Sequence, residues 1–177
     1  MLGLLILIAA AFVVWRFAAP AAAFVRGFSG LLDRPVPASH PVWRAIAGRD
    51  HAGGLFGGFE VVLVFHQKRG DSDRGYLIVA MRPQRPLPPS LERDGALRES
   101  VARSPAQNAW DDLELKYELQ LSCADGFLKA QWSPAGFVFF PGRFDPERWR
   151  LVLQAMHTVV AALDQSQESI RFDNRSK

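Results

Sequence analysis

The sequence predicts an α+β protein: an N-terminal transmembrane helix, then an antiparallel β-sheet of about five strands with a C-terminal α-helix packed on one face. Three features of the 177-residue chain predict it: an uncharged apolar run at the start, a strictly alternating stretch before an Asp-Gly pair, and a capped amphipathic helix near the end. The chain is long enough for one domain with appendages. We expect a membrane-anchor helix over 1–25, a juxtamembrane linker over 26–40, the α+β globular domain over 41–165 and a disordered polar tail over 166–177.

The apolar run at the start of the chain, residues 1–15, contains no charged side chain. As a helix it would reach about 22 Å, which is short of the roughly 30 Å hydrocarbon core of a bilayer. Extension to Ala19 closes this gap if Arg16 snorkels to the lipid headgroups beside Trp15 and Phe17. We therefore expect a retained single-pass membrane anchor, with Trp15, Arg16 and Phe17 as its anchors at the membrane interface.

Positive charge is asymmetric around this run. No Lys or Arg precedes it, and several Arg residues follow it closely: Arg16, Arg26, Arg34, Arg44 and Arg49. Because an excess of basic residues marks the cytoplasmic side of a membrane helix, we expect a bacterial-type inner (cytoplasmic) membrane location with the N-terminus outside and the soluble domain in the cytoplasm. Two alternatives stay open: a cleaved signal peptide with its cleavage site near residues 21–23, and an interfacial or partner-packed helix.

A strict alternation of apolar and polar residues runs from Asp112 to Cys123. Its apolar members are Leu113, Leu115, Tyr117, Leu119, Leu121 and Cys123. This period of two predicts a strand with one buried and one wet face. The Asp125-Gly126 pair that follows favours a two-residue type I′ turn. Such a turn predicts the cross-strand pairs Cys123–Leu128, Leu121–Ala130, Leu119–Trp132, Ser122–Lys129 and Gln120–Gln131.

Other elements are predicted from local patterns. Residues 59–66 are apolar on both sides at their middle, which predicts a central strand covered on both faces, with 76–81 as its antiparallel partner. We also expect a brief helix over 41–47, a weak helix over 90–103, a loop over 104–109 and a short strand over 137–140.

The last predicted element is a helix with Asp145 as its N-cap and Pro146 at its first position. Its apolar seam, spaced three and four residues apart, consists of Trp149, Val152, Met156, Val159 and Leu163. We expect this seam to pack on the apolar face of the hairpin, which is made by Leu119, Leu121, Leu128, Ala130 and Trp132.

The most glycine-dense stretch, residues 53–58, lies just before a predicted strand. A dinucleotide-binding glycine loop instead follows a strand and opens a helix. We therefore expect a turn or strand entry that needs positive φ, with a ligand-covering loop as the alternative. The ligand or loop candidates are Gly53, Gly54, Gly57, Gly58, His51 and His66. No histidine stands at a metal-binding spacing and Cys123 is the only cysteine, so the sequence predicts no metal site and no cofactor.

The formal net charge of +3 gives no argument for nucleic-acid binding. The sequence contains neither H-E-x-x-H nor G-x-S-x-G. We therefore expect a non-enzymatic interaction or accessory module held at the membrane, with a protein partner in a membrane complex. The alternatives are a membrane-tethered enzyme of unrecognised type, with its site near 53–58 and His66, and a small-ligand or lipid-binding domain with a cavity between sheet and helix.

Overall fold

The computed structural model describes residues 3, 6, 23–35, 51–66, 76–85, 87–92, 95–102, 104–133 and 144–173 of the chain. Several predictions fall outside these ranges: most of the transmembrane helix, including Trp15, Arg16 and Phe17, the helix over 41–47, and the strand over 137–140. Within the described ranges, no helix is both long enough and apolar enough to cross a membrane.

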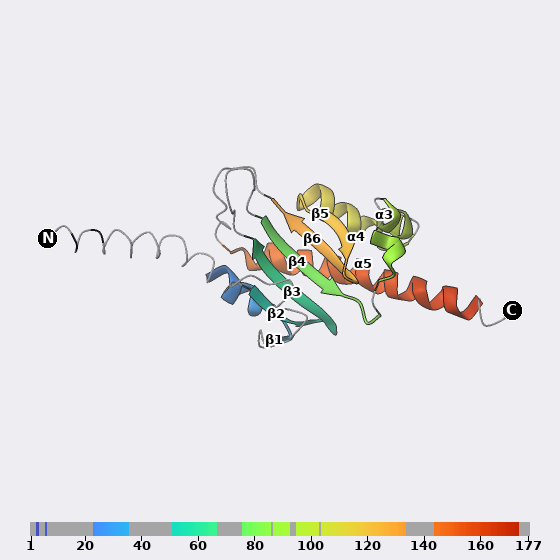
Figure 1. The fold of residues 1–177 in the computed structure, drawn as a ribbon, viewed down its shortest axis with the longest axis horizontal. Helices are drawn as coiled ribbons and strands as arrows, with labels where there is room; N and C mark the ends of the chain where they lie inside the picture. The colour runs from blue at the N-terminus through green and yellow to red at the C-terminus, as the bar shows by residue number, and fades with distance from the viewer. Residues whose placement is uncertain are drawn as a thin grey trace.

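A six-stranded antiparallel sheet forms the centre of the domain, with the strand order β1-β2-β3-β4-β6-β5 (Figure 1). Its strands are β1 (Arg34–Pro35), β2 (His51–Phe56), β3 (Phe59–His66), β4 (Tyr76–Arg82), β5 (Gln120–Ala124) and β6 (Phe127–Trp132). β3 pairs with β2 on one side and with β4 on the other. The predicted central strand over 59–66 and its partner over 76–81 are therefore confirmed.

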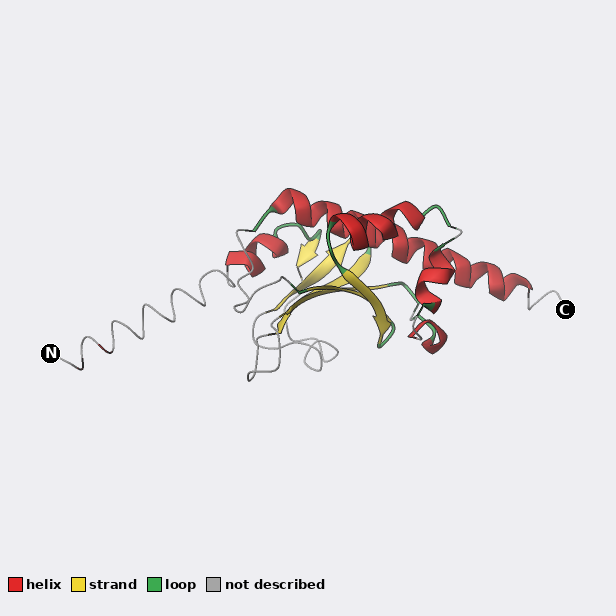
Figure 2. Cartoon of the chain, turned by 90° about the horizontal axis from the view of Figure 1, so that it is seen from above, coloured by secondary structure: helices red, strands yellow, loops and turns green. Residues whose placement is uncertain are grey.

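Helices cover one face of this sheet (Figure 2). The helical elements are a segment over 23–29, η1 (Pro89–Glu92), α3 (Ala96–Val101), α4 (Gln107–Asp111), the π-helical η2 (Asp112–Lys116) and α5 (Pro146–Asp173). An antiparallel sheet with a C-terminal helix confirms the predicted α+β class. One local prediction was wrong, because α4 begins inside the expected loop over 104–109. The helix expected over 90–103 is present in part, as the shorter η1 and α3.

α5 begins where the sequence predicts it. Oδ1 of Asp145 accepts hydrogen bonds from the backbone N–H groups of Glu147 at 3.0 Å and Arg148 at 3.1 Å, which is N-cap geometry. The whole predicted seam is buried: Trp149, Val152, Met156, Val159 and Leu163. The helix continues to Asp173, past the start of the disordered tail expected from residue 166. Gln, Glu and Arg in this last part are good helix formers, which explains the extension.

The β5–β6 hairpin has the predicted turn and almost the whole predicted register. Asp125 and Gly126 both have positive φ, 57° and 77°, as a type I′ turn requires. The ladder contains the pairs Gln120–Gln131, Leu121–Ala130, Ser122–Lys129, Cys123–Leu128 and Ala124–Phe127. Because this ladder begins at Gln120, the expected pair Leu119–Trp132 is not part of it.

The first half of the strand predicted over 112–123 is helical instead. η2 occupies it and continues α4 without a break. Leu113 and Tyr117 are buried there, whereas Leu115 is 80% exposed. A spacing of four residues places Leu113 and Tyr117 on one side of a helix, and the buried Trp110 continues that side upstream. The alternating pattern thus also contains a helical seam, and packing onto the core selects the helix.

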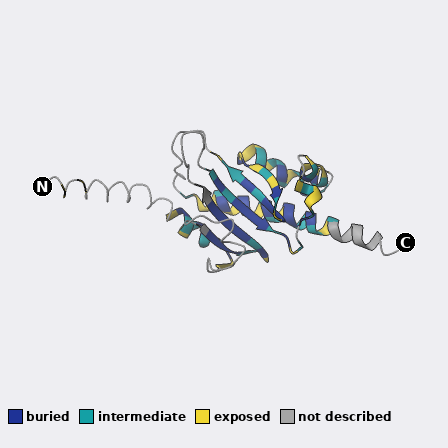
Figure 3. Ribbon diagram, viewed as in Figure 1, coloured by how far each residue is buried: buried dark blue, intermediate teal, exposed yellow. Residues whose placement is uncertain are grey.

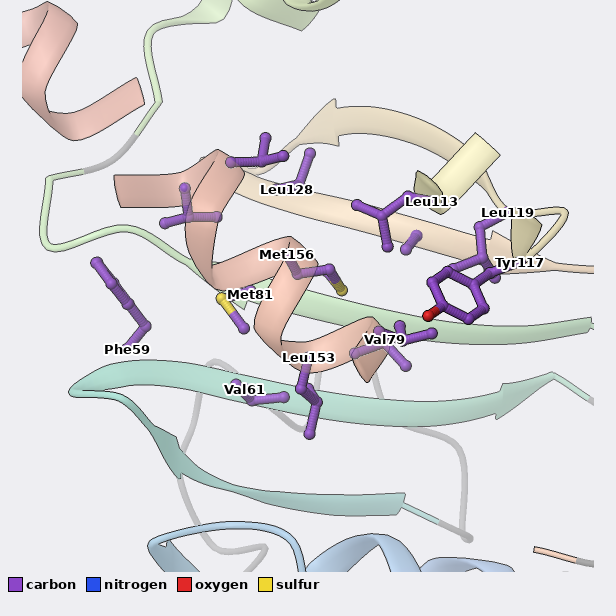
Figure 4. Packing of buried hydrophobic residues seen from close by; sticks show 14 of the residues in the cluster. Phe59, Val61, Val79, Met81, Leu113, Tyr117, Leu119, Leu128, Leu153 and Met156 are labelled. Carbon is purple, nitrogen blue, oxygen red and sulfur yellow. The ribbon is translucent and has the colours of Figure 1, made fainter. Parts of the chain in front are cut away.

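The main core lies between the sheet and α5. Leu153 and Met156 of α5 lie over Val61, Val79 and Met81 of the sheet, and all of these side chains are fully buried (Figure 4). Burial of one such side chain contributes about 1.5–3 kcal/mol to folding. The predicted packing of the helix seam on the hairpin is also present, since Leu128 and Ala130 belong to the same core.

A second, smaller apolar cluster lies on the other face of the sheet and consists of Val62, Val64, Ala80 and Phe127. Neighbouring residues of β3 alternate between the two clusters, so this strand is buried on both sides, as its sequence predicts. Buried residues lie along the central strands, and exposed residues lie on the outer sides of the helices (Figure 3).

The chain before β2 is also part of the domain. The helical segment over 23–29 places Phe24 and Phe28 against Trp149 at the start of α5, with ring centroids 5.4 Å and 6.2 Å away. Both phenylalanines are buried, and β1 then pairs with β2. The core therefore begins at Phe24, ahead of the stretch over 26–40 that the sequence suggested as a linker.

Candidate functional site

The turn between β2 and β3 brings part of the glycine-rich stretch against α5. Gly57 and Gly58 form this turn with φ angles of 57° and 85°. Residues other than glycine rarely adopt such positive φ angles. The N–H of Gly57 donates a 2.7 Å hydrogen bond to Oδ2 of Asp33. A Cβ on Gly57 would lie only 2.5 Å from Cδ2 of His157, so the imidazole of α5 packs directly on the turn.

Aromatic side chains complete the surroundings of His157. Its ring meets Phe59 edge-on, with 5.0 Å between ring centroids, and Phe56 with 6.4 Å. The histidine is partly buried by these contacts. It is therefore His157, and not one of the two histidines singled out from the sequence, that lies beside the glycine turn.

Gly53 and Gly54 lie inside β2 rather than in a loop. They stand opposite Val62 and Val61 in the β2–β3 ladder. A Cβ on Gly54 would overlap the carbonyl oxygen of Arg34. The absence of a Cβ on Gly54 therefore allows β1 to approach β2 closely.

His51 and His66 lie at the other end of the same hairpin. His51 is the first residue of β2, and His66 is the last residue of β3. Eight residues of strand at about 3.3 Å each separate His66 from Gly58 by some 26 Å. The structure therefore does not gather the sequence candidates into one site.

A cleft of about 220 Å³ lies between α5 and the chain that leaves β4. It is lined by Phe59, Gln84, Arg85, Ala161, Asp164 and Gln165. The Asp164 carboxylate accepts hydrogen bonds from two consecutive backbone N–H groups, those of Gln84 at 3.0 Å and Arg85 at 3.4 Å. Asp164 thus ties the exit of β4 to α5, and Phe59 joins the cleft to the contact around His157.

The cleft is small and has a mixed aromatic and polar lining. The cleft offers an aromatic wall and polar groups, but its volume is below the roughly 300–1,000 Å³ of common ligand pockets. Among the described residues, no three His, Cys, Asp or Glu side chains could hold a metal ion together.

Cys123 lies in the core and is not one of the residues that line this cleft. Burial is the main cause that raises the pKa of Cys123 to about 11, and the nearby Glu92 adds to the effect. The side chain is therefore a protonated thiol at neutral pH, which is a poor nucleophile.

Sequence reasoning missed Asp164 and gave His157 no role. A signal was present, because His157, Ala161 and Asp164 follow each other at four and three residues on one side of the predicted helix. The residues that contact Asp164 could not be predicted from neighbouring sequence, because the hydrogen bond between Arg85 and Asp164 joins residues 79 positions apart. Comparison of the chain with protein-family models, with curated proteins and with solved structures found no match.

Proposed function

We propose that this chain is a single-pass protein of the inner (cytoplasmic) membrane, with its N-terminus outside and its α+β domain in the cytoplasm. The domain acts as a non-enzymatic interaction or accessory module that binds a protein partner in a membrane complex. One observation carries the proposal: the uncharged run over 1–15 is followed, within eight residues, by a helical segment that is part of the domain core.

Contacts at the start of this segment and just after its end support a fixed connection between anchor and domain. Phe24 meets the rings of Phe144 and Trp149 at 5.0 Å and 5.4 Å between centroids. Four residues after the segment ends, the N–H of Asp33 donates a 2.8 Å hydrogen bond to the carbonyl oxygen of Leu55. An anchor joined in this way holds the domain close to the bilayer, which suits a module that meets a partner within the membrane.

Two polar side chains near the cleft make structural contacts within the domain. The Asp164 carboxylate is used by the backbone N–H groups of Gln84 and Arg85. The His157 ring is used by packing on Gly57 and Phe59. Both side chains thus hold the domain together.

Alkaline carbonate extraction of membranes that contain the full chain tests the anchor. We expect the chain to stay in the membrane pellet. Ile8→Arg should release it, because a charge at the centre of a membrane helix costs about 2.5–3.5 kcal/mol, whereas the matched Ile8→Leu should not. Release of the unchanged chain would contradict the anchor.

Reporter fusions after Lys177 test the orientation. A fluorescent protein that folds in the cytoplasm should be bright, and a phosphatase that is active only after export should be inactive. An active phosphatase together with a dark fluorescent fusion would overturn the cytoplasmic placement.

Affinity purification of the full chain in mild detergent tests the interaction role. We expect a protein to co-purify in a fixed ratio and to survive salt washing. Recovery of the membrane-inserted chain alone, under several detergents, would count against an accessory subunit.

Small-ligand binding is the second candidate function, and the cleft at α5 favours it. A thermal-shift screen of small polar metabolites would reveal a compound that raises the melting temperature. Ala161→Trp should remove that rise by filling the cleft, while Gln154→Trp, on the exposed side of the same helix, should keep it.

A further inference from the structure

We propose that the end of the domain where α5 begins lies against the lipid surface of the membrane, with Leu115 entering the headgroup region. The inference rests on the membrane anchor of the proposed function and adds the lipid surface itself as a second contact.

Three segments distant in sequence meet at this end. The helical segment over 23–29, the start of α5 and the end of β6 lie side by side (Figure 1). Phe24 and Trp132 both contact Trp149, with ring centroids 5.4 Å and 6.5 Å away. The chain that follows the apolar run therefore enters the domain at this end.

η2 presents Leu115 at the same end. Nη2 of Arg148, in the first turn of α5, donates a 3.1 Å hydrogen bond to the carbonyl oxygen of Tyr117, just after η2. The Arg148 guanidinium also lies over the Trp132 ring at 5.4 Å. Leu115 is two residues before Tyr117 and is 80% exposed.

Chain length limits the distance between this end and the bilayer. Arg16, which we expect at the headgroups, precedes Phe24 by eight residues. Eight residues span at most about 29 Å even when fully extended. α5 has 28 residues and extends about 42 Å away from this point. The tether therefore keeps Phe24 within about 29 Å of the headgroups, whereas no such limit applies directly to the far end of α5.

The chemistry of this end fits a membrane interface. Tryptophan side chains are enriched at the headgroup level of membrane proteins, and arginine side chains can reach the headgroups by snorkelling. The partly buried Trp132 and Arg148 are in contact at this end. A single exposed leucine would bind lipid weakly on its own. The anchor makes the contact intramolecular, at an effective concentration in the millimolar range, so that a weak apolar contact suffices.

Charge predicts which lipids this surface accepts. Three exposed basic residues at this end, Arg26, Lys116 and Arg150, are balanced by three exposed acidic residues, Glu118, Asp145 and Glu147. An anionic surface therefore has little net attraction for it. We expect the contact to be apolar and to form on neutral and on anionic bilayers alike.

The test uses the full chain in vesicles of phosphatidylcholine, with and without phosphatidylglycerol. In a Cys123→Ala background, Leu115→Cys carries an environment-sensitive fluorophore, and Glu99→Cys is the matched control on an exposed position of α3. Spin-labelled lipid and aqueous iodide serve as quenchers. We expect a blue shift and lipid quenching at position 115 in both vesicle types, and iodide quenching only at position 99.

The outcomes separate this inference from the proposed function. If carbonate removes the chain from the vesicles, the anchor fails, and this inference fails with it. If the chain is retained but position 115 behaves like position 99, the inference alone is overturned. Shielding of position 115 from iodide without lipid quenching also overturns it, because a protein surface would then cover Leu115.

Discussion

At the end of the domain where α5 begins, aromatic rings make the contacts, as the edge-on packing of Phe24, Trp132 and Trp149 shows. At the opposite end, backbone turns and hydrogen bonds make them. Gly57 needs a positive φ there, and Asp164 accepts from two backbone N–H groups beside an open cleft. The first end is stabilised by buried apolar area and the second by local conformation, so the same kind of substitution should have unequal effects at the two ends.

The largest effect should come from the aromatic end. Trp149→Ala removes a side chain that is 4% exposed and contacts Phe24, Phe28 and Trp132. We expect a loss of about 3–5 kcal/mol in the free energy of unfolding. The neighbouring exposed Arg150→Ala should change it by no more than about 0.5 kcal/mol. Urea midpoints in mild detergent measure both, and equal midpoints for the two variants would refute the assigned packing.

A second pair of substitutions compares the buried side of η2 with its exposed side. Leu113→Ala should cost about 2–5 kcal/mol because Leu113 is fully buried. Leu115→Ala should cost no more than about 0.5 kcal/mol because Leu115 is 80% exposed. The same urea titration compares them, and a strand in place of η2 would make the two costs similar.

The glycine turn at the opposite end should respond less strongly. Gly57→Ala and Gly58→Ala both force alanine into a left-handed conformation, at a cost of about 1–2 kcal/mol each. Gly57→Ala should cost more, since its Cβ meets the His157 ring, whereas a Cβ on Gly58 meets open space. Adding His157→Ala to Gly57→Ala should remove the extra stability loss of Gly57→Ala relative to Gly58→Ala, because the Cβ then no longer meets the imidazole ring. A double-mutant cycle in thermal melts measures this coupling, and a coupling of zero would contradict the contact.

A smaller change is expected at the first turn of α5. Asp145→Ala removes the acceptor for the N–H groups of Glu147 and Arg148 and should cost about 0.5–2 kcal/mol. Asp145→Asn keeps an acceptor oxygen at the cap and should stay close to the unchanged chain. Loss of stability in Asp145→Asn equal to that in Asp145→Ala would show that the cap hydrogen bonds are not the cause.

The last substitution should have its pH-dependent effect only in alkaline solution and none at neutral pH. Burial raises the pKa of Cys123 from 9.0 to about 11. The folded state therefore holds this proton more tightly than the unfolded state. The contribution to stability is fully present below pH 9 and is lost as the pH rises toward 11. Relative to Cys123→Ala, the unchanged chain should lose stability between these values, and parallel pH profiles of the two proteins would contradict the shift.

Elements with strong local signals could be predicted from the sequence. The Asp125-Gly126 pair alone was enough to predict the β5–β6 turn. Asp145 and the following Pro146 were enough to predict the start of α5. The strand over 59–66 was visible because both of its faces are apolar. In each case the residues that determine the structure are neighbours in the chain.

Elements determined by distant contacts could not be predicted in this way. The spacing of Leu113 and Tyr117 fits both a strand and a helix, and only packing against α5 decides between them. Gly54 appeared to belong to a turn because its neighbour in β1 lies twenty residues upstream. The cleft depends on the contact of Asp164 with Gln84 and Arg85, which no local pattern reveals.

The most direct test of the central claim is amide hydrogen exchange of the full chain in mild detergent or nanodiscs. The claim is that the segment over 23–33, which precedes the sheet, belongs to the folded domain. The N–H groups of Gly30, Leu31, Leu32 and Asp33 all donate backbone hydrogen bonds, the last one to Leu55 of β2. We predict that peptides over 24–33 are protected to a degree similar to the first turns of α5. Exchange of these amides at the rate of an unstructured chain, while α5 stays protected, would contradict the claim.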